Sequence, residues 1–162
     1  MGFSIRPYQD SDRSELIRFM EELQDYMVSI DSMHLRRRLP AYGETYANYL
    51  LQEIQEHQGL ILIAEVQNIA VGVIAGIIEN QMEDDLLEWI PHTTGRVLEL
   101  YISDHHRAQG IGKMLMQKME TYFLEKNCDV VRIEVLSANR RAYDFYRKSG
   151  YNDRFVDVIK FL

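Results

Sequence analysis

Residues 97–113, VLELYISDHHRAQGIGK, are the stretch that decides the fold. They join a β-rich run, Val97 to Ile102, to a basic, glycine-rich turn and then to a segment whose apolar residues recur at helical spacing. The glycines therefore lie where a helix begins. Amide groups in the first turn of a helix have no internal acceptor and carry partial positive charge, and glycine lets a phosphate approach them. The stretch predicts a binding seat for a pyrophosphate-bearing cofactor.

The glycine turn matches neither of the two common nucleotide motifs. A dinucleotide fingerprint needs a third glycine where Leu115 stands, and a P-loop needs Ser or Thr where Met114 follows the lysine. The six residues from Arg107 to Gly112 instead resemble the Arg/Gln-x-x-Gly-x-Gly/Ala signature of the GCN5-related N-acetyltransferases (GNAT). In that family, the loop and helix start wrap the pyrophosphate of acetyl-coenzyme A.

A second segment carries the same resemblance. Residues 139–151, NRRAYDFYRKSGY, follow a strand-like run from Val130 to Val135. They are similar to the other hallmark of the family, an Asn after a strand, an Ala three residues later, an aromatic-Tyr pair and a closing Gly-aromatic. The resemblance is specific from about Val97 to Tyr151, and the order of elements extends it over nearly the whole chain.

Periodicity predicts the remaining elements. These are a strand over Phe3–Tyr8, a helix after the 10–12 cluster to about Ile30, a helix from Glu44 to about His57, a hairpin of Leu60–Val66 and Ala70–Ile78, a helix to about Lys126, and a last strand near Phe155–Phe161. A right-handed crossover can place the strands at 97 and 130 side by side and parallel. The resemblance implies an α/β (α+β) fold with a mixed central sheet of about six to seven strands, about four helices, and this parallel pair splayed around the pantetheine arm.

Composition limits the class of protein. The chain has 162 residues, 46% hydrophobic and 27% charged, which suits a single acetyltransferase domain over residues 1–162. It has no long apolar run and no signal pattern, so we expect a cytoplasmic location without membrane contact. A net charge of −7 argues against nucleic acid and is compatible with a cationic acceptor. Cys128 has no metal-ligand neighbours, so we expect a buried thiol and no metal site. A homodimer remains open.

Glu99 is the candidate general base. An alkylamine is protonated at neutral pH, so a carboxylate, or a water that it orders, must take the proton before acetyl transfer. Alternation along the strand predicts that Leu98, Leu100 and Ile102 share one apolar face and that Glu99 and Tyr101 share the other. The alternative interpretation of Glu99 is a half-exposed glutamate on a solvated sheet face.

Tyr146 is the candidate general acid. It stands seven residues after Asn139, at the end of the aromatic pair, and resembles the family tyrosine that protonates the departing thiolate. The alternative is a core tyrosine of an amphipathic helix. The resemblance further implies cofactor contacts from Leu100, Tyr101, Ile102, Arg107, Gln109, Gly110, Ile111, Gly112, Lys113, Asn139 and Tyr146. We interpret His105 and His106 as surface residues.

The acceptor is the least determined partner. The candidates for a pocket that holds a cation are Asp25, Tyr26, Asp31, Tyr42 and Tyr46. The acidic run from Glu83 to Glu88 either attracts a cation or is a solvated connector, and the triple arginine at 36–38 caps or solvates its loop. Three functions stay open, namely acetyl-coenzyme A-dependent transfer to a small-molecule primary amine, transfer to a protein α-amino group or lysine, and an inactive acyl-coenzyme A-binding regulator. A closed, aromatic-walled pocket favours the first, and an open groove favours the second.

Overall fold

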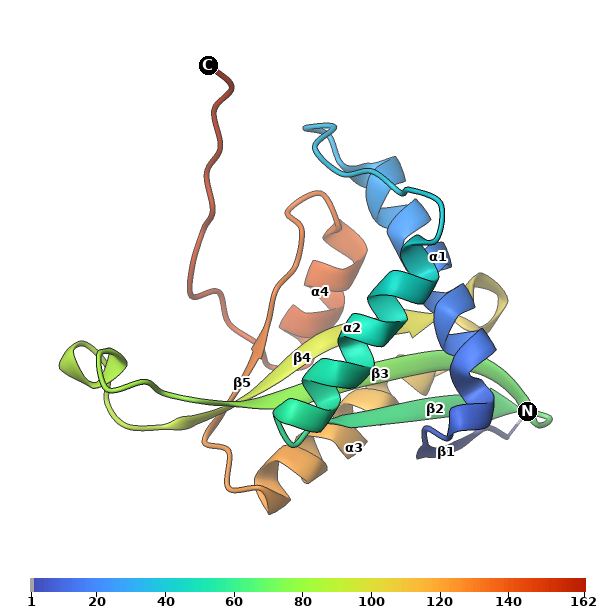
Figure 1. Cartoon of the computed structure of the whole chain (residues 1–162), viewed down its shortest axis with the longest axis horizontal. Coiled ribbons are helices and arrows are strands. Elements are labelled where there is room, and N and C mark those ends of the chain that lie inside the picture. The colour runs from blue at the N-terminus through green and yellow to red at the C-terminus, as the bar shows by residue number, and fades with distance from the viewer. Residues whose placement is uncertain (1) are drawn as a thin grey trace.

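The computed structural model describes residues 2–162. Five strands form one sheet, and four α-helices pack around it (Figure 1). In chain order the elements are β1 (Ser4–Pro7), α1 (Arg13–Ile30), α2 (Tyr42–Glu56), β2 (Leu60–Val66), β3 (Ile69–Asn80), β4 (Thr93–Ile102), α3 (Ile111–Glu125), β5 (Val130–Ile133) and α4 (Arg140–Lys148). None of the described helices combines the length and the apolar character that a bilayer crossing requires.

The sheet confirms the mixed α/β fold and the splayed strand pair. Its strands run in the order β1-β2-β3-β4-β5, antiparallel as far as β4 and parallel between β4 and β5. The parallel register covers only Thr94 to Val97 on β4 and Val130 to Ile133 on β5. The remainder of β4 continues to Ile102 without a β5 partner. A cleft can therefore open between the two strands beyond Val97.

The sheet has five strands, which is slightly fewer than the six to seven expected. The last expected strand, near Phe155–Phe161, is extended chain without strand pairing. Its composition is typical of a strand, but a strand needs a neighbouring backbone to accept its hydrogen bonds, and the described chain offers this segment none. The composition of this segment therefore indicates a propensity for β-structure, but without a pairing partner the segment does not join the sheet.

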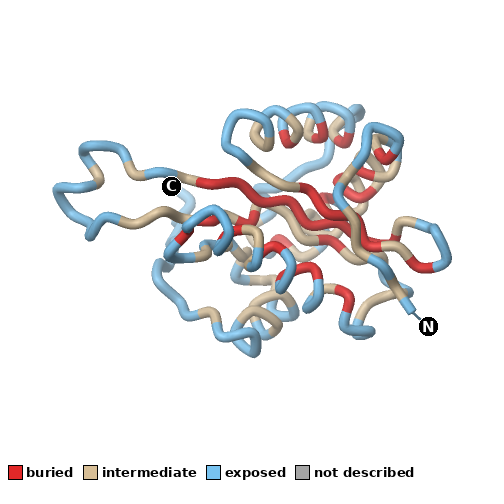
Figure 2. The backbone as a smooth tube through the Cα atoms, turned by 90° about the horizontal axis from the view of Figure 1, so that it is seen from below, coloured by how far each residue is buried: buried red, intermediate tan, exposed pale blue. Residues whose placement is uncertain are grey.

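The core has two halves, one on each face of the sheet (Figure 2). On one face, α1 and α2 bury residues such as Phe19, Leu16 and Leu50 against β2 and β3. On the other face, α3 buries Leu115 and Phe123, and α4 packs there through partly buried aromatics. Helices on both faces explain why the β2–β3 hairpin is apolar almost without interruption.

Two boundaries differ from expectation in ways that shape the molecule. The β3–β4 pairing continues to Asn80 and Thr93, beyond the body of the sheet, and forms an arm that carries the acidic connector at its tip (Figure 1). Helix α2 begins two residues early, directly after Ala41, whose left-handed φ of 62° turns the chain into the helix. The thiol of Cys128 is buried as expected.

Candidate functional site

The glycine turn that was predicted as an anion seat lies directly before α3. Gly110 has a φ of 84°, a left-handed conformation that glycine adopts without strain, and it precedes the first helical residue. The first bond of the helix runs from the Met114 amide to the Gly110 carbonyl, at 3.1 Å. Within residues 2–162, none of the five consecutive amides from Gln109 to Lys113 donates a hydrogen bond to protein. This arc of free donors at a positive helix end fits a pyrophosphate.

Arg107 connects this seat to the end of β4. Its Nε donates to the Ile102 carbonyl at 2.7 Å, and its guanidinium forms an ion pair with Asp104. The same group lies 5.6 Å from the ring centroid of Tyr101 and 5.7 Å from that of Tyr26. The side chain therefore fixes the loop against the strand end. Its charge is shared with the Asp104 carboxylate.

A cavity of about 330 Å³ lies where β4 and β5 diverge. Its walls come from β4, the end of β5 and the chain after it, the inner faces of α1 and α2, the loop between these two helices, and α4. Glu99, Tyr146 and Asn139 all line it. The structure thus brings together the two expected catalytic residues, which are separated by nearly fifty positions in the chain.

A β-bulge aims Glu99 into this cavity. Ala75 pairs with Glu99 but Gly76 pairs with Val97, so Leu98 is an extra residue in β4. Leu98 packs with the α1 and α2 core, whereas Leu100 packs with the α3 core. The expected alternation was therefore wrong at Leu98, which shares the side of Glu99. Bulges redirect side chains in this way, and no feature of the sequence signals this one.

Burial raises the pKa of the Glu99 carboxyl to about 7. Two neighbours oppose that rise, namely a hydrogen bond from the Tyr46 hydroxyl to Oε1 and the nearby positive charge of Arg36. Tyr46 is in turn stacked on Tyr42, with ring centroids 5.4 Å apart and nearly parallel planes. The carboxyl is thus held in place by an aromatic wall and can change protonation state near neutral pH.

Tyr146 and Asn139 form the opposite wall. Burial, and secondarily the charge of Glu99, raises the pKa of Tyr146, so its hydroxyl keeps its proton. Within residues 2–162, the Tyr146 hydroxyl makes no hydrogen bond to another protein group. The Asn139 side chain caps α4 by accepting from the Ala142 amide at 3.2 Å, and it also accepts from the Tyr26 hydroxyl at 3.3 Å. Asn139 therefore ties α4 to α1 at the cavity rim.

Some residues expected at the acceptor pocket lie elsewhere. Asp25 pairs with Arg38, and Asp31 accepts hydrogen bonds from three amides of its own loop, which lowers its pKa. Tyr26 meets Asn139 rather than the cavity, and the acidic connector lies on the β3–β4 arm, away from the cavity. Only Tyr42 and Tyr46 of the expected set line the pocket.

Among the lining residues that were not expected there, two bear on the chemistry of the cavity. Arg36, which was interpreted as a loop cap, faces the cavity, and it makes no ion pair within the described part of the chain. Tyr49, one turn after Tyr46, also lines it, with the two rings 5.7 Å apart. The spacing of Tyr42, Tyr46 and Tyr49 on one helical face could have indicated an aromatic wall.

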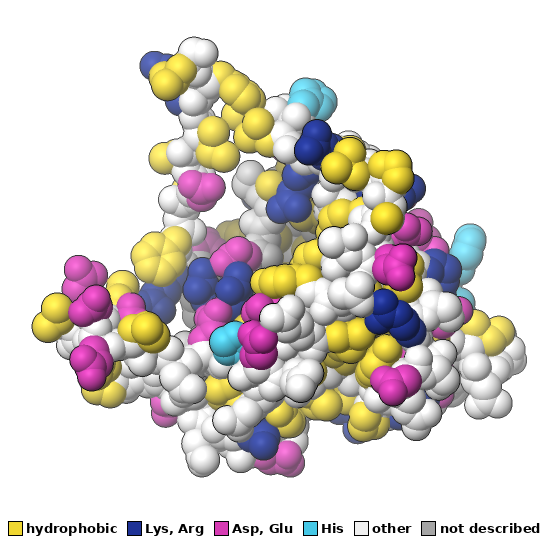
Figure 3. Space-filling view, viewed as in Figure 1, with side chains coloured by type: hydrophobic (Ala, Val, Ile, Leu, Met, Phe, Trp, Pro, Cys, Tyr) yellow, Lys and Arg dark blue, Asp and Glu magenta, His cyan; other side chains and the backbone are white. Residues whose placement is uncertain are grey.

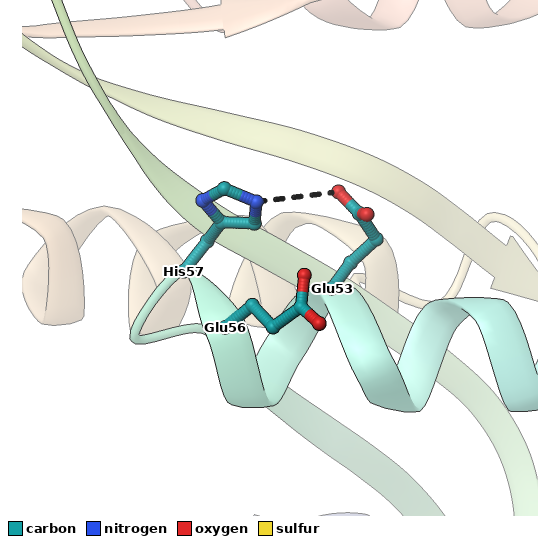
Figure 4. A group of neighbouring side chains, drawn as sticks. All are labelled: Glu53, Glu56 and His57. Atoms are coloured by element: carbon teal, nitrogen blue, oxygen red, sulfur yellow. Dashed lines mark ion pairs between the residues drawn. The ribbon is translucent and has the colours of Figure 1, made fainter.

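A group of metal-capable side chains lies outside the cavity, at the end of α2 (Figure 4). Glu53, Glu56 and His57 bring their ligand atoms within 4.8 Å of one another, and His57 Nε2 is 3.9 Å from Glu53. Two of the three are exposed. The contact between His57 and Glu53 joins two of the three, and Glu56 accepts a hydrogen bond from Gln52 at 2.8 Å. His105 and His106 form a short 3₁₀ turn after β4, where His105 is exposed and Nδ1 of His106 is buried without a partner in residues 2–162.

Comparison with known proteins identifies the family of the chain. The profile of the Acetyltransferase (GNAT) family matches residues 17–151. A thialysine N-epsilon-acetyltransferase of Bos taurus is 28% identical over 92% of this chain and 84% of its own length. An N-alpha-acetyltransferase of Sulfurisphaera tokodaii is 26% identical over 84% of this chain and 77% of its own.

Solved structures share the fold. A tetramutant protein of Bacillus halodurans has a TM-score of 0.84 at 16% identity, covering 98% of this chain and 99% of the other. Glucosamine-6-phosphate N-acetyltransferase of Arabidopsis thaliana has a TM-score of 0.69 at 15% identity, covering 99% of both chains. With the family profile spanning most of its length, the chain belongs to the Acetyltransferase (GNAT) family.

Proposed function

We propose that this protein transfers the acetyl group of acetyl-coenzyme A to the primary amine of a small molecule. One observation carries the proposal, namely a carboxyl of raised pKa that faces a tyrosine hydroxyl across an aromatic-walled cavity, at the gap between β4 and β5. The free amides from Gln109 to Lys113 provide the diphosphate seat at the adjacent helix end. The family assignment supports the acetyl donor.

In this proposal, Glu99 and Tyr146 carry out different proton transfers. Glu99, directly or through one water, accepts a proton from the ammonium form of the acceptor, which frees the nitrogen lone pair. The amine then attacks the thioester carbonyl, forming the C–N bond as the C–S bond breaks. Tyr146 donates its proton to the departing sulfur, the proton that the new amide nitrogen loses returns to the Tyr146 oxygen, and Glu99 releases its proton to water. Because the pKa of Glu99 is about 7, the carboxylate is a stronger base than an ordinary glutamate and is still partly ionised at neutral pH.

The cavity supports a small acceptor that also carries an anionic group. Tyr42, Tyr46 and Tyr49 enclose one side, as a small-molecule pocket requires. Arg36 stands at the same cavity with an unpaired charge within the described chain, whereas Arg96 is neutralised by Glu79 at 2.8 Å. An amine linked to a carboxylate would place its ammonium near Glu99 and its carboxylate near Arg36. The name of the bovine relative, an acetyltransferase of the thialysine ε-nitrogen, is consistent with this substrate class.

The test is a screen of amines with acetyl-coenzyme A and detection of the released thiol. The panel contains amino acids with side-chain amines, polyamines, amino sugars, and peptides with a free α-amino group or lysine. We expect turnover of a small amine, with amino acids preferred. Glu99→Gln should lower kcat by about 10²–10³-fold, and Tyr146→Phe should lower it less. Glu56→Gln, an exposed glutamate of α2, is the matched control and should leave the rate unchanged.

Each other outcome identifies an alternative. Turnover of peptides alone would support a protein acetyltransferase, as the archaeal N-alpha-acetyltransferase relative suggests. Binding of acetyl-coenzyme A without turnover of any amine would support the regulator. Unchanged rates in Glu99→Gln and Tyr146→Phe would refute the assigned roles. Arg36→Ala should raise KM for carboxylate-bearing amines by about tenfold and leave KM for polyamines unchanged.

A further inference from the structure

Tyr26, near the C-terminal end of α1, contacts both walls of the cleft from outside the cavity. The end of α1 lies beside the start of α4 (Figure 1), and the surface is hollowed between α4 and the pair of helices α1 and α2 (Figure 3). Asn139 and Arg107, from which we expect cofactor contacts, belong to different walls of this hollow. The hydroxyl of Tyr26 bonds to the first, and its ring lies near the guanidinium of the second.

The hydroxyl of Tyr26 helps to fix the orientation of the Asn139 amide group. Oδ1 of Asn139 accepts from the Ala142 amide at 3.2 Å and from the Tyr26 hydroxyl at 3.3 Å, so both of its lone pairs are used. Nδ2 points the other way, and its one hydrogen bond within residues 2–162 is to the thioether sulfur of Met27 at 3.9 Å, a weak acceptor. The amide therefore keeps one N–H that can donate to a ligand.

The remaining donor of Asn139 suits an amide carbonyl in the cleft. Asn139 and Met27 both line the cavity between β4 and β5. The pantetheine arm of acetyl-coenzyme A carries two amide groups, and a buried carbonyl that finds no donor weakens binding. A flipped Asn139 amide would present its oxygen to that carbonyl, and two acceptors repel each other. The Tyr26 hydroxyl and the Ala142 amide together select the orientation in which Asn139 can bind the arm.

The ring of Tyr26 contacts the other wall through Arg107. The Arg107 guanidinium lies 5.7 Å from the centroid of this ring and 5.6 Å from that of Tyr101, so two aromatic rings attract its charge. Tyr101 is itself fixed, because its hydroxyl donates to Glu22 at 2.6 Å. Glu22 and Tyr26 are one turn apart and lie on the same face of α1. This face therefore holds Arg107 in place, two residues before the free amides that begin at Gln109.

We propose that Tyr26 is a positioning residue for acetyl-coenzyme A, which orients the amide of Asn139 with its hydroxyl and the guanidinium of Arg107 with its ring. The inference rests on the proposed function, because it takes acetyl-coenzyme A as the ligand of the cleft. Tyr26 does not touch the cofactor. It acts through Asn139 at the pantetheine arm and through Arg107 at the diphosphate. Because the hydroxyl serves one contact and the ring serves the other, the two effects can be removed one at a time.

The experiment measures the affinities of two ligands for the full chain by calorimetry. Acetyl-coenzyme A has both the diphosphate and the pantetheine arm, whereas adenosine 3′-phosphate 5′-diphosphate, the fragment, lacks the arm. Tyr26→Phe removes the hydroxyl and keeps the ring, so we expect it to weaken acetyl-coenzyme A binding about fivefold and to leave fragment binding unchanged. Tyr26→Leu also removes the ring and should weaken fragment binding by about threefold.

The matched control is Tyr143→Phe. It removes a tyrosine hydroxyl from α4 that donates to Asp153 at 2.8 Å, outside the cavity. Both ligands should bind this variant as tightly as they bind wild type. Melting temperatures verify that all variants are folded.

A double-mutant cycle with Asn139→Ser tests whether the hydroxyl acts through Asn139. Serine can still cap α4 but has no amide to orient. In this background, Tyr26→Phe should cause no further loss of acetyl-coenzyme A affinity. A loss that persists there, or an equal loss of fragment affinity, would overturn the role of the hydroxyl. Unchanged fragment affinity in Tyr26→Leu would overturn the role of the ring.

The wild-type affinities separate this inference from the proposed function. If wild type binds both ligands and Tyr26→Phe binds acetyl-coenzyme A equally tightly, the positioning role is overturned and the proposed function stands. If wild type binds neither ligand, both are overturned.

Discussion

At the scale of single residues, Glu99 combines a functional feature with a cost in stability. Folding raises the pKa of its carboxyl from 4.5 to about 7, mainly through burial. Between these pH values the folded protein holds a proton that the unfolded chain has released. The free energy of unfolding therefore falls as pH rises through this window, and the loss persists above it. The carboxylate that we propose as the general base is thus placed where its charge opposes folding.

Replacing Glu99 with glutamine should remove this cost. At about pH 8 we expect Glu99→Gln to have a free energy of unfolding higher than wild type by on the order of 3 kcal/mol, and at about pH 4 to match it. Urea denaturation at both pH values measures the difference. Glu56→Gln, on the exposed face of α2, should show no such pH dependence. If the difference in free energy of unfolding between the variant and wild type were the same at both pH values, the raised pKa of Glu99 would be contradicted.

The hydroxyl of Tyr46 should set the pH at which the enzyme becomes active. It donates a hydrogen bond to the Glu99 carboxylate and so favours the charged form. In Tyr46→Phe the pKa of Glu99 should rise, and the acidic limb of the kcat/KM profile should move to higher pH. Tyr49→Phe removes a hydroxyl from the same wall without a bond to Glu99, and its profile should stay in place. If the pH profile of Tyr46→Phe did not move, the Tyr46 hydroxyl would have no effect on the pKa of the proposed base.

At the scale of elements, we expect a methyl group on Gly112, at the start of α3, to leave the helix stable but to weaken cofactor binding. A Cβ on Gly112 would meet Phe145 and Ile102 only at ordinary contact distances, 3.8 and 3.9 Å. Alanine also favours a helix over glycine, so Gly112→Ala should not lower the melting temperature. The added methyl should hinder the approach of a diphosphate and weaken acetyl-coenzyme A binding by about tenfold, as measured by calorimetry. Gly2→Ala, with no neighbour within 4 Å, is the control. Unchanged affinity would place the diphosphate elsewhere.

Local patterns predicted this element well and its surroundings less well. The order of a strand, a glycine turn and a helix is written into consecutive residues, so the free amides at Gln109 to Lys113 followed from the sequence. The bulge at Leu98 could not be predicted from the sequence. A bulge depends on the register between two strands, and the residues of neither strand indicate that register. Arg36 was misplaced for a related reason, since the path of a loop between two helices is set by what it packs on.

At the scale of the whole molecule, burial is unevenly distributed. Strand β3 is buried over most of its length, and α1, α2 and α3 each contribute fully buried side chains. Helix α4 has no buried residue, and β5 is half-buried at best. The last strand and helix of the chain are therefore attached to a well-packed body through fewer apolar contacts. The family resemblance predicted most of the elements, with the last strand as the exception, but it could not report how many apolar contacts hold each one.

This asymmetry predicts which part of the protein opens first. Amides of α4 should exchange with solvent at least tenfold faster than those of β3, because local opening of a poorly buried helix costs less free energy than global unfolding. Since Asn139 and Tyr146 line the cleft from α4, acetyl-coenzyme A should slow exchange in α4 and leave β2 unaffected. Hydrogen exchange followed by mass spectrometry, with and without the cofactor, measures both effects. If α4 without cofactor exchanged as slowly as β3, its stability would come from contacts other than apolar burial. If the cofactor slowed β2 as much as α4, binding would act on the whole fold rather than on the cleft wall.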